Sequence, residues 1–297
     1  MEPSHRVAPS PGKKNSAKGW TLTQTNSLEF RPETAIFRTR RLCTTRSSND
    51  YNYLWIHWCP SVVNKRTRLA PRCLWSSTFM TLRILIGILA DVTLAVATFG
   101  CAVQLYRFSQ NTKHSPPFVS ILIIGVTALI TSLQFPFPEV LADFRRNREA
   151  LLAGEWWRMV TPLFVQSSGW WQCCINGVGA VIVCPLAEKF YGKKLLALYF
   201  IPGILGEVFA YFWAPNGAGS SLGIAGVVGG LFAFIFFRRQ EISKLTCIFA
   251  IFGIVSAVVL SFSRDNHGPP MLIGFSLASL MMILCPDTGL KPMPVTP

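Results

Sequence analysis

Seven apolar segments, each about the length of a membrane-spanning helix, fill most of the chain after residue 80. A helix needs about 20 apolar residues to cross about 30 Å of hydrocarbon. Only 14% of all residues are charged, against about 25% in soluble domains. Most segments are apolar on every face, which argues against a soluble helical core, so we expect an all-α, multi-pass membrane protein. The segments are Leu82–Leu105, Phe118–Phe137, Leu163–Leu186, Leu195–Trp213, Leu222–Phe237, Leu245–Phe262 and Pro270–Cys285.

A basic region precedes these segments. Residues 1–79 hold about half of the Lys and Arg in a chain of net charge +14, together with few acids and many Ser and Thr. This composition is typical of an organelle transit segment, and it equally fits a disordered basic tail or a stretch ahead of a true start at Met80. A transit segment would indicate the mitochondrial inner membrane, whereas a bacterial chain would lie in the cell membrane. No recognisable motif accompanies the charge, so no nucleic acid is predicted as a partner.

Charges between the segments indicate which ends face inward. Loops Glu188–Lys194 and Arg238–Lys244 each carry several Lys or Arg, whereas Ala214–Ser221 and Ser263–Gly268 carry only Arg264. Because positive loops stay on the cytoplasmic or equivalent face, the first two loops are predicted inside and the other two outside. With seven spans the basic N-terminal region then falls outside. Either it faces a mitochondrial matrix, or it is absent, or the first segment is not a span.

Polar landmarks surround the third segment. The aromatic pair before it, which includes Trp157, and the adjacent Arg158 suit a membrane interface, where rings lie at headgroup level and a guanidinium extends outward. Gln172 and Asn176 are four residues apart and therefore share one face of a helix. Glu188 follows at the predicted inner end of the segment.

The fifth and seventh segments carry the remaining landmarks. Small residues in the fifth segment allow close packing against neighbouring helices. These are Gly223, Gly226 and Gly230. Ahead of the seventh segment His267 precedes Met271 by four residues, and Gly274 follows. The polar residues gather near the outer ends of the third, fifth and seventh segments, which predicts a cavity open to one side of the membrane.

In their order and depth these landmarks resemble those of the rhomboid family of intramembrane serine peptidases, over about Phe118–Cys285. The resemblance implies a rhomboid-like six-helix core, preceded here by one extra N-terminal transmembrane helix. It implies single-span membrane proteins as substrates or clients within the lipid bilayer, and no metal or organic cofactor, with the oligomeric state left open. The expected parts are a basic, disordered or targeting segment (1–79), the extra helix (80–110), the membrane domain (111–286) and a short tail (287–297).

Departures from the family's pattern bear on activity. The nucleophile position holds Ala225, and a methyl group cannot attack a carbonyl. The position of the general-base His holds Met271. A further His of the family is replaced by Gln172, while Asn176 is kept; these amides either donate to an oxyanion or pair with neighbouring helices. The resemblance therefore implies a pseudoprotease-like relative that binds transmembrane segments.

An active alternative places the catalytic pair one helical turn nearer the outer face. Ser221 lies four residues before Ala225, and His267 lies four residues before Met271. Both are thus displaced roughly 6 Å in the same direction, which allows a dyad of Ser221 and His267. The alternatives are an ordinary helix N-cap for Ser221 and a solvated loop position for His267.

Two acids inside apolar segments need partners, because charge within lipid is costly and often functional. Asp91 lies near the middle of the first segment and is expected to contact the core. Glu207 is expected to bond a neighbouring helix or to line a water-filled cavity. A small-molecule transporter or channel is the alternative of another class, although the two halves show no convincing repeat.

Overall fold

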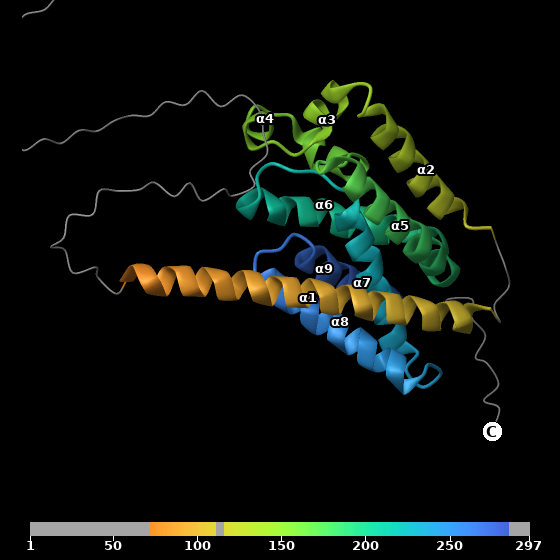
Figure 1. The fold of residues 1–297 in the computed structure, drawn as a ribbon. Helices are drawn as coiled ribbons and strands as arrows, with labels where there is room; N and C mark the ends of the chain where they lie inside the picture. Colours follow the sequence, from red (N-terminus) through yellow and green to blue (C-terminus); the bar gives the residue numbers. More distant parts are fainter. Residues whose placement is uncertain (1–71, 111–115, 285–297) are drawn as a thin grey trace, which may run out of the picture. The chain divides into compact units, whose positions relative to one another are not determined.

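The computed structural model describes residues 72–110 and 116–284, with side chains from residue 81 onward, all within one compact unit, Arg66–Pro297. Across these residues every regular element is a helix, and an isolated antiparallel bridge joins Arg146 to Gly217. The expected all-α fold is confirmed. The helices are α1 (Arg72–Ser109), α2 (Phe118–Leu133), α3 (Pro138–Phe144), α4 (Arg148–Leu152), η1 (Trp156–Met159), η2 (Thr161–Phe164), α5 (Gly169–Tyr191), η3 (Gly192–Lys194), α6 (Leu195–Trp213), α7 (Ser221–Phe237), α8 (Lys244–Phe262) and α9 (Gly268–Leu284) (Figure 1).

Several expected parts fall outside the described residues. These are residues 1–71 of the basic segment, residues 111–115 between α1 and α2, and the tail at 287–297. The boundaries of the four parts, and the choice between mitochondrial and bacterial membranes, therefore stay predictions.

Each apolar segment of the sequence contains one long helix, but the third begins later than its composition indicates. Leu163 lies in the short helix η2, and α5 starts at Gly169, whose φ of +67° favours glycine. By length and composition, Thr81–Ser109 of α1, the continuous stretch of α5 and α6, and α8 can cross a membrane. Among the described residues, α2, α7 and α9 are shorter apolar helices.

Helix α7 forms the centre of the bundle, because its neighbours cover it on every side. Its residues are buried without interruption from Leu222 to Ile235, and it packs against α5, α6, α8 and α9. The contact with α9 is at backbone distance: a methyl group added at Gly274 would overlap the carbonyl of Gly226. On the other side, a methyl at Gly226 would lie 2.7 Å from the carbonyl oxygen of Leu198 on α6. These glycines therefore set how closely the central helices approach.

Glu188 fastens the inner end of α5 to the start of α2. Its carboxylate accepts hydrogen bonds from the backbone N–H groups of Val119 and Ser120, at 2.9 and 2.7 Å, and from the Ser120 hydroxyl at 2.6 Å. A negative charge at a helix N-terminus is favourable because the first N–H groups of a helix lack intrahelical partners. This contact is structural rather than catalytic, since it lies at the opposite end of α5 from Gln172.

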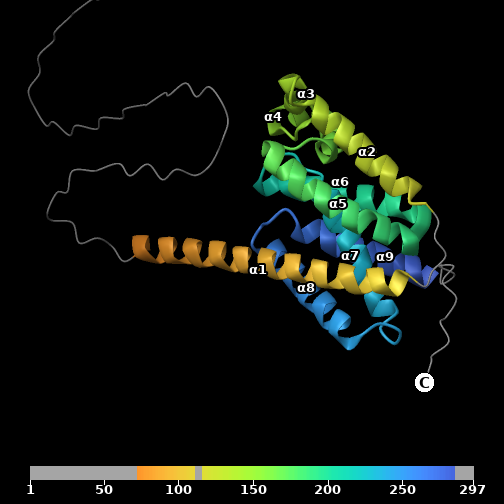
Figure 2. The same ribbon diagram turned by 45° about the vertical axis from the view of Figure 1, so that its right-hand side comes forward.

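Helix α1 lies alongside α8, as both views show (Figures 1 and 2). The two helices touch where Gly100 leaves room for the ring of Phe249, and where Arg83 donates two hydrogen bonds to the carbonyl of Ser263, at 3.2 and 2.5 Å. Because α1 has 38 residues, it is about 57 Å long at about 1.5 Å per residue, which exceeds the thickness of a bilayer core.

The length of α1 changes the position expected for Asp91. The sequence placed it near the middle of a span, yet its carboxylate lies within reach of Asp265 and His267, in the loop between α8 and α9. The middle of the apolar segment is therefore level with the end of the neighbouring helix. The expected contact between the extra helix and the core is present.

Candidate functional site

A cavity of about 420 Å³ opens between the start of α5, the α6–α7 loop and the α8–α9 loop. Its position agrees with the prediction that polar residues gather at the outer ends of the third, fifth and seventh apolar segments. The residues of the lining that bear on function are Arg146, Gln172, Asn176, Glu207, Ser221 and His267.

Ser221 and His267 both line this cavity, but no hydrogen bond joins them in the described part of the chain. Ser221 is half-buried as the first residue of α7, and its hydroxyl lies near Gly219 of the preceding loop. The N-cap position itself belongs to Ser220, whose hydroxyl accepts a hydrogen bond from Gln166 at 3.0 Å. Ser221 is thus free of the capping role that the sequence allowed for it.

The ring of His267 is held by its neighbour two residues earlier. Its Nδ1 lies 2.8 Å from Oδ1 of Asp265, which also accepts a hydrogen bond from the His267 backbone N–H at 2.8 Å. Burial of the ring acts to lower the pKa of His267, but the hydrogen bond and charge of Asp265 outweigh it and raise that pKa above its ordinary value. The side chain keeps 41% exposure, so the ring is both oriented and accessible.

Ala225 and Met271 occupy a different environment. Both are nearly fully buried, at 5% and 2% exposure, and both belong to the hydrophobic core rather than to the cavity lining. A methyl added at Gly229, one turn further along α7, would overlap the carbonyl of Met271. Ala225 and Met271, which the resemblance assigns to the nucleophile and general-base positions, therefore both lie in the apolar core.

The two amides expected at the oxyanion site hold the cavity wall together. Gln172 accepts a hydrogen bond from the backbone N–H of Ser168 at 2.8 Å and donates to the carbonyl of Ala218 at 3.0 Å. Asn176 donates to Oε1 of Gln166 at 2.8 Å. These contacts correspond to the alternative in which both amides pair with neighbouring elements.

Gln166 is the centre of a buried amide network that sequence reasoning missed. Besides its bonds to Asn176 and Ser220, it exchanges hydrogen bonds with Gln134, through its N–H at 2.8 Å and its carbonyl at 3.0 Å. The network joins the segment before α5 to the end of α2 and the start of α7. The available signal was the polar side chain of Gln134 close to the end of an apolar segment, where burial demands a partner.

A second feature missed from sequence is the buried ion pair of Arg146 and Glu207, which lines the same cavity. Arg146 and Glu207 are 2% and 0% exposed. Arg146 also donates to the carbonyl of Ala214 through Nε and Nη2, at 3.1 and 2.7 Å, and burial lowers its pKa to about 10. Glu207 lines a cavity as expected, whereas its partner Arg146 lies in the loop between α3 and α4 and not on a neighbouring helix.

Arg158 departs from its expected position at the membrane interface. Its guanidinium does not extend outward: the residue is buried, and it donates to the carbonyls of Ala142 and Arg145 at 2.6 and 3.1 Å. It also pairs with Glu155 at 2.6 Å. These carbonyls belong to the end of α3, where backbone oxygens lack helical partners, so they are free to accept hydrogen bonds from the guanidinium. Trp157 does remain exposed, as an interfacial ring should.

Comparison with known proteins agrees with this geometry. Residues 153–284, which run from the loop of Trp157 to the end of α9, match the family model described as the rhomboid domain. The rhomboid protease GluP of Bacillus subtilis (strain 168) is 33% identical over 96 residues, covering 31% of this chain and 19% of the relative. Rhomboid-like protease 2 of Toxoplasma gondii is 26% identical over 181 residues, covering 54% of this chain and 63% of the relative.

The chain thus spans less than two thirds of each of these relatives. The matched region nevertheless includes the long helices α5 to α9, with the glycine contact of α7 and α9 and the cavity between their outer ends. Together with the apolar helices, it makes this an integral membrane protein. Residues 153–284 therefore form a rhomboid domain.

Proposed function

We propose that this chain binds transmembrane segments of other membrane proteins in its rhomboid fold. We further propose that it does not cleave them with residues at the two positions where the family has its catalytic Ser and His. The observation that carries the proposal is the burial of Ala225 and Met271 in the apolar contact of α7 and α9. Ser–His hydrolysis requires a hydroxyl to attack and an imidazole to take its proton. A methyl group and a thioether supply neither.

The proposed clients are single-span membrane proteins. A segment that crosses the membrane alone is not packed against other helices of its own chain. It can therefore move from lipid into a binding site without breaking helix–helix contacts. The cavity offers such a segment hydrogen-bonding groups at its outer end, because Gln172 and Ser221 line it beside the buried pair of Arg146 and Glu207. The two relatives are named as proteases, and that activity is a property of those proteins.

The test is reconstitution of the full chain in liposomes with a fluorescent single-span peptide that carries a photo-crosslinker. The expected result is cross-linking to the wild type without fragments of the peptide. A fluorophosphonate probe, which needs an activated serine, should leave the wild type unlabelled. Fragments released by the wild type, or covalent labelling of the wild type by the probe, would contradict the proposal.

A second candidate function is intramembrane hydrolysis by Ser221 and His267. One observation favours it: both residues line the cavity, and Asp265 holds Nδ1 of His267 as an acid partner holds a general base. In this reaction the Ser221 oxygen would bond to the substrate carbonyl carbon while His267 takes the hydroxyl proton. His267 would then return the proton to the leaving amine as the C–N bond breaks. Water would next attack the acyl carbon and give a proton to His267, which would return it to the Ser221 oxygen as the ester bond breaks. Geometry before substrate binding is often looser than in the reacting complex.

Hydrolysis by this pair has a direct test in the same liposomes. Wild type, Ser221→Ala and His267→Ala are compared for cleavage of the peptide and for labelling by a fluorophosphonate. The displaced dyad predicts cleavage by the wild type alone. Equal cleavage in all three proteins, or none in any, excludes it.

A further inference from the structure

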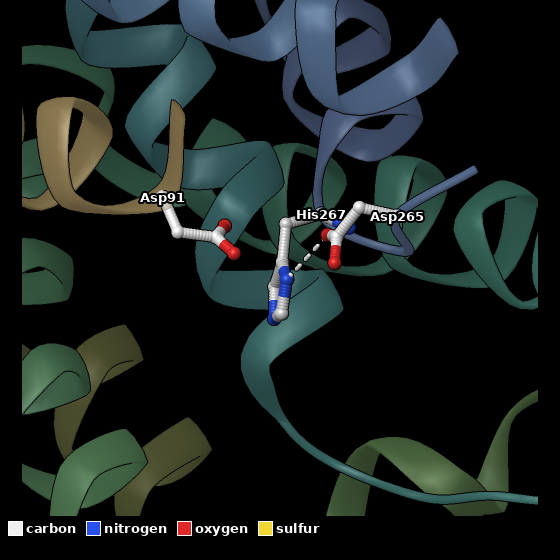
Figure 3. A group of neighbouring side chains, drawn as sticks. All are labelled: Asp91, Asp265 and His267. Atoms are coloured by element: carbon white, nitrogen blue, oxygen red, sulfur yellow. Dashed lines mark hydrogen bonds and ion pairs between the residues drawn. The ribbon is translucent and has the colours of Figure 1, made fainter. Parts of the chain in front are cut away.

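A cluster of three metal-ligating side chains lies beside the cavity of the candidate site, and His267 belongs to both. Asp91 comes from α1, while Asp265 and His267 come from the α8–α9 loop, and one ligand atom from each lies within 4.8 Å of the other two. Figure 3 shows the carboxylate of Asp91 turned toward the ring of His267, with Asp265 on the ring's other side. The residues are far apart in sequence, so the packing of α1 against α8 creates the cluster.

The surrounding contacts hold these groups in place before any ligand arrives. Arg83, two turns before Asp91 on α1, donates to the carbonyl of Ser263. The backbone N–H of Asp265 donates to the carbonyl of Leu260 at 2.9 Å, which ties the loop to the end of α8. A preformed site binds more tightly, because less conformational entropy is lost on binding.

The carboxylate of Asp91 receives no hydrogen bond from any side chain in residues 81–110 and 116–284. It is solvent-exposed, and together with Asp265 it borders a cavity of about 340 Å³ through which an ion can enter. Two carboxylates at this separation repel each other unless a cation lies between them. Arg83 and Arg264 also border the cavity, but Arg83 is engaged with the Ser263 carbonyl.

We infer that Asp91, Asp265 and His267 form a site for a divalent transition-metal ion that joins α1 to the α8–α9 loop. One imidazole nitrogen and two carboxylate oxygens are a donor set that Zn²⁺ accepts, with water completing the coordination. Sites of oxygen ligands alone suit Mg²⁺ or Ca²⁺ instead, so the imidazole favours a transition metal. This inference does not depend on the proposed function, because it concerns the ion alone.

The competing occupant is a proton on His267, which would make the ring itself the cation between the two carboxylates. A metal requires the neutral imidazole, so proton and metal exclude each other and Zn²⁺ binding should weaken as the pH falls. A bound ion would also occupy His267 and remove it as a base beside Ser221.

The experiment uses the full chain, purified in detergent and freed of metal with EDTA. Zn²⁺ binding is measured by equilibrium dialysis with metal analysis, and Co²⁺ serves as a spectroscopic probe because bound thiolates give intense near-ultraviolet bands that nitrogen and oxygen ligands lack. The variants are Asp91→Asn and His267→Ala. The matched control is Glu139→Gln, which neutralises an exposed acid on α3 outside the cluster.

We expect the wild type and Glu139→Gln each to bind one equivalent of Zn²⁺. Asp91→Asn and His267→Ala should bind this ion at least 10-fold more weakly. The Co²⁺ spectrum of the wild type should show no thiolate bands. Equal Zn²⁺ binding in all four proteins would overturn the inference, because the remaining His and the Cys residues would then account for it. A thermal midpoint that responds to pH but not to Zn²⁺ would assign the cation to the proton alone. Asp91→Glu keeps the carboxylate but shifts its position. A Zn²⁺ affinity between those of the wild type and Asp91→Asn would show that the weaker binding comes from loss of a ligand and not from loss of the fold.

Discussion

The outer turn of α7 and the turn below it differ sharply, although they are parts of one helix and face the same neighbour. At the outer turn Ser221 borders a cavity shared with His267. Four residues deeper, Ala225 and Met271 lie in apolar packing that excludes water. One helix thus borders a polar cavity at its first turn and an apolar core at the next. The predictions below test this contrast between a polar layer and a dry one.

The buried ion pair in the wall of the polar layer should have the largest effect. Glu207→Gln leaves the guanidinium of Arg146 buried without its counter-charge, and we expect a loss of about 3–5 kcal/mol in unfolding free energy. The control is Glu241→Gln, which breaks the pair with Arg238 at the more exposed inner end of α7 and should cost about 0–1 kcal/mol. Denaturant titration in detergent measures both, and similar losses would contradict the difference in burial.

Close packing in the dry layer should have the next largest effect. Gly274→Ala places a methyl group against the backbone of Gly226, which cannot move aside as a flexible side chain would. We expect a loss of about 1–3 kcal/mol, as for other overpacked cores. Gly125→Ala on α2 is the control, because nothing lies within 4 Å of its added methyl. A Gly274→Ala protein as stable as the Gly125→Ala protein would show that α7 and α9 can separate without cost.

The same chemical change, one turn apart on α7, compares the two layers directly. Ala225→Ser buries a hydroxyl in apolar packing, and we expect it to lower the unfolding free energy by about 1–3 kcal/mol. Ser221→Ala removes a half-buried hydroxyl from the cavity edge, and its effect should stay within about 0.5 kcal/mol. Thermal unfolding of the two variants beside the wild type measures the difference. Equal effects would mean that the deeper layer is also accessible to water.

The smallest effect concerns pH. The raised pKa of His267 means that its protonated form gains from folding, so this contribution is present below about pH 6.5 and is lost as the pH rises through the folded-state pKa. Asp265 has a lowered pKa, because the hydrogen bond and charge of His267 outweigh the opposing effect of burial, so its contribution disappears as the medium turns acidic. The midpoint difference between wild type and His267→Ala should therefore shrink from pH 6 to pH 8. A difference that grows over this range would reverse the assignment.

The positions of the long helices could be predicted because length and composition alone identify apolar segments. The close packing of α7 against its neighbours also followed from its glycines, since small residues at fixed intervals have few other uses in lipid. The partner of Glu207 could not be predicted, because Arg146 lies 61 residues earlier in a loop and no local pattern joins the two. The burial of Arg158 could not be predicted either, because beyond the nearby Glu155 its partners are backbone carbonyls that no side chain identifies.

The prediction that Asp91 lies near the middle of a span was wrong for a different reason. Hydropathy measures how far an apolar stretch extends, but it does not say where the neighbouring helix ends. Because α1 is longer than α8, the centre of its apolar stretch lies beside a loop rather than beside lipid. A prediction of depth needs the lengths of both helices and the register between them.

The pairing of α1 with α8 has a consequence for how the protein is made. Arg83 and the carbonyl it binds are 180 residues apart, and synthesis at about 5–20 residues per second separates their appearance by about ten seconds or more. During that interval the polar face that carries Asp91 has no partner from its own chain. Newly made α1 must therefore hold Arg83 and Asp91 without these partners until α8 and the loop after it have been synthesised.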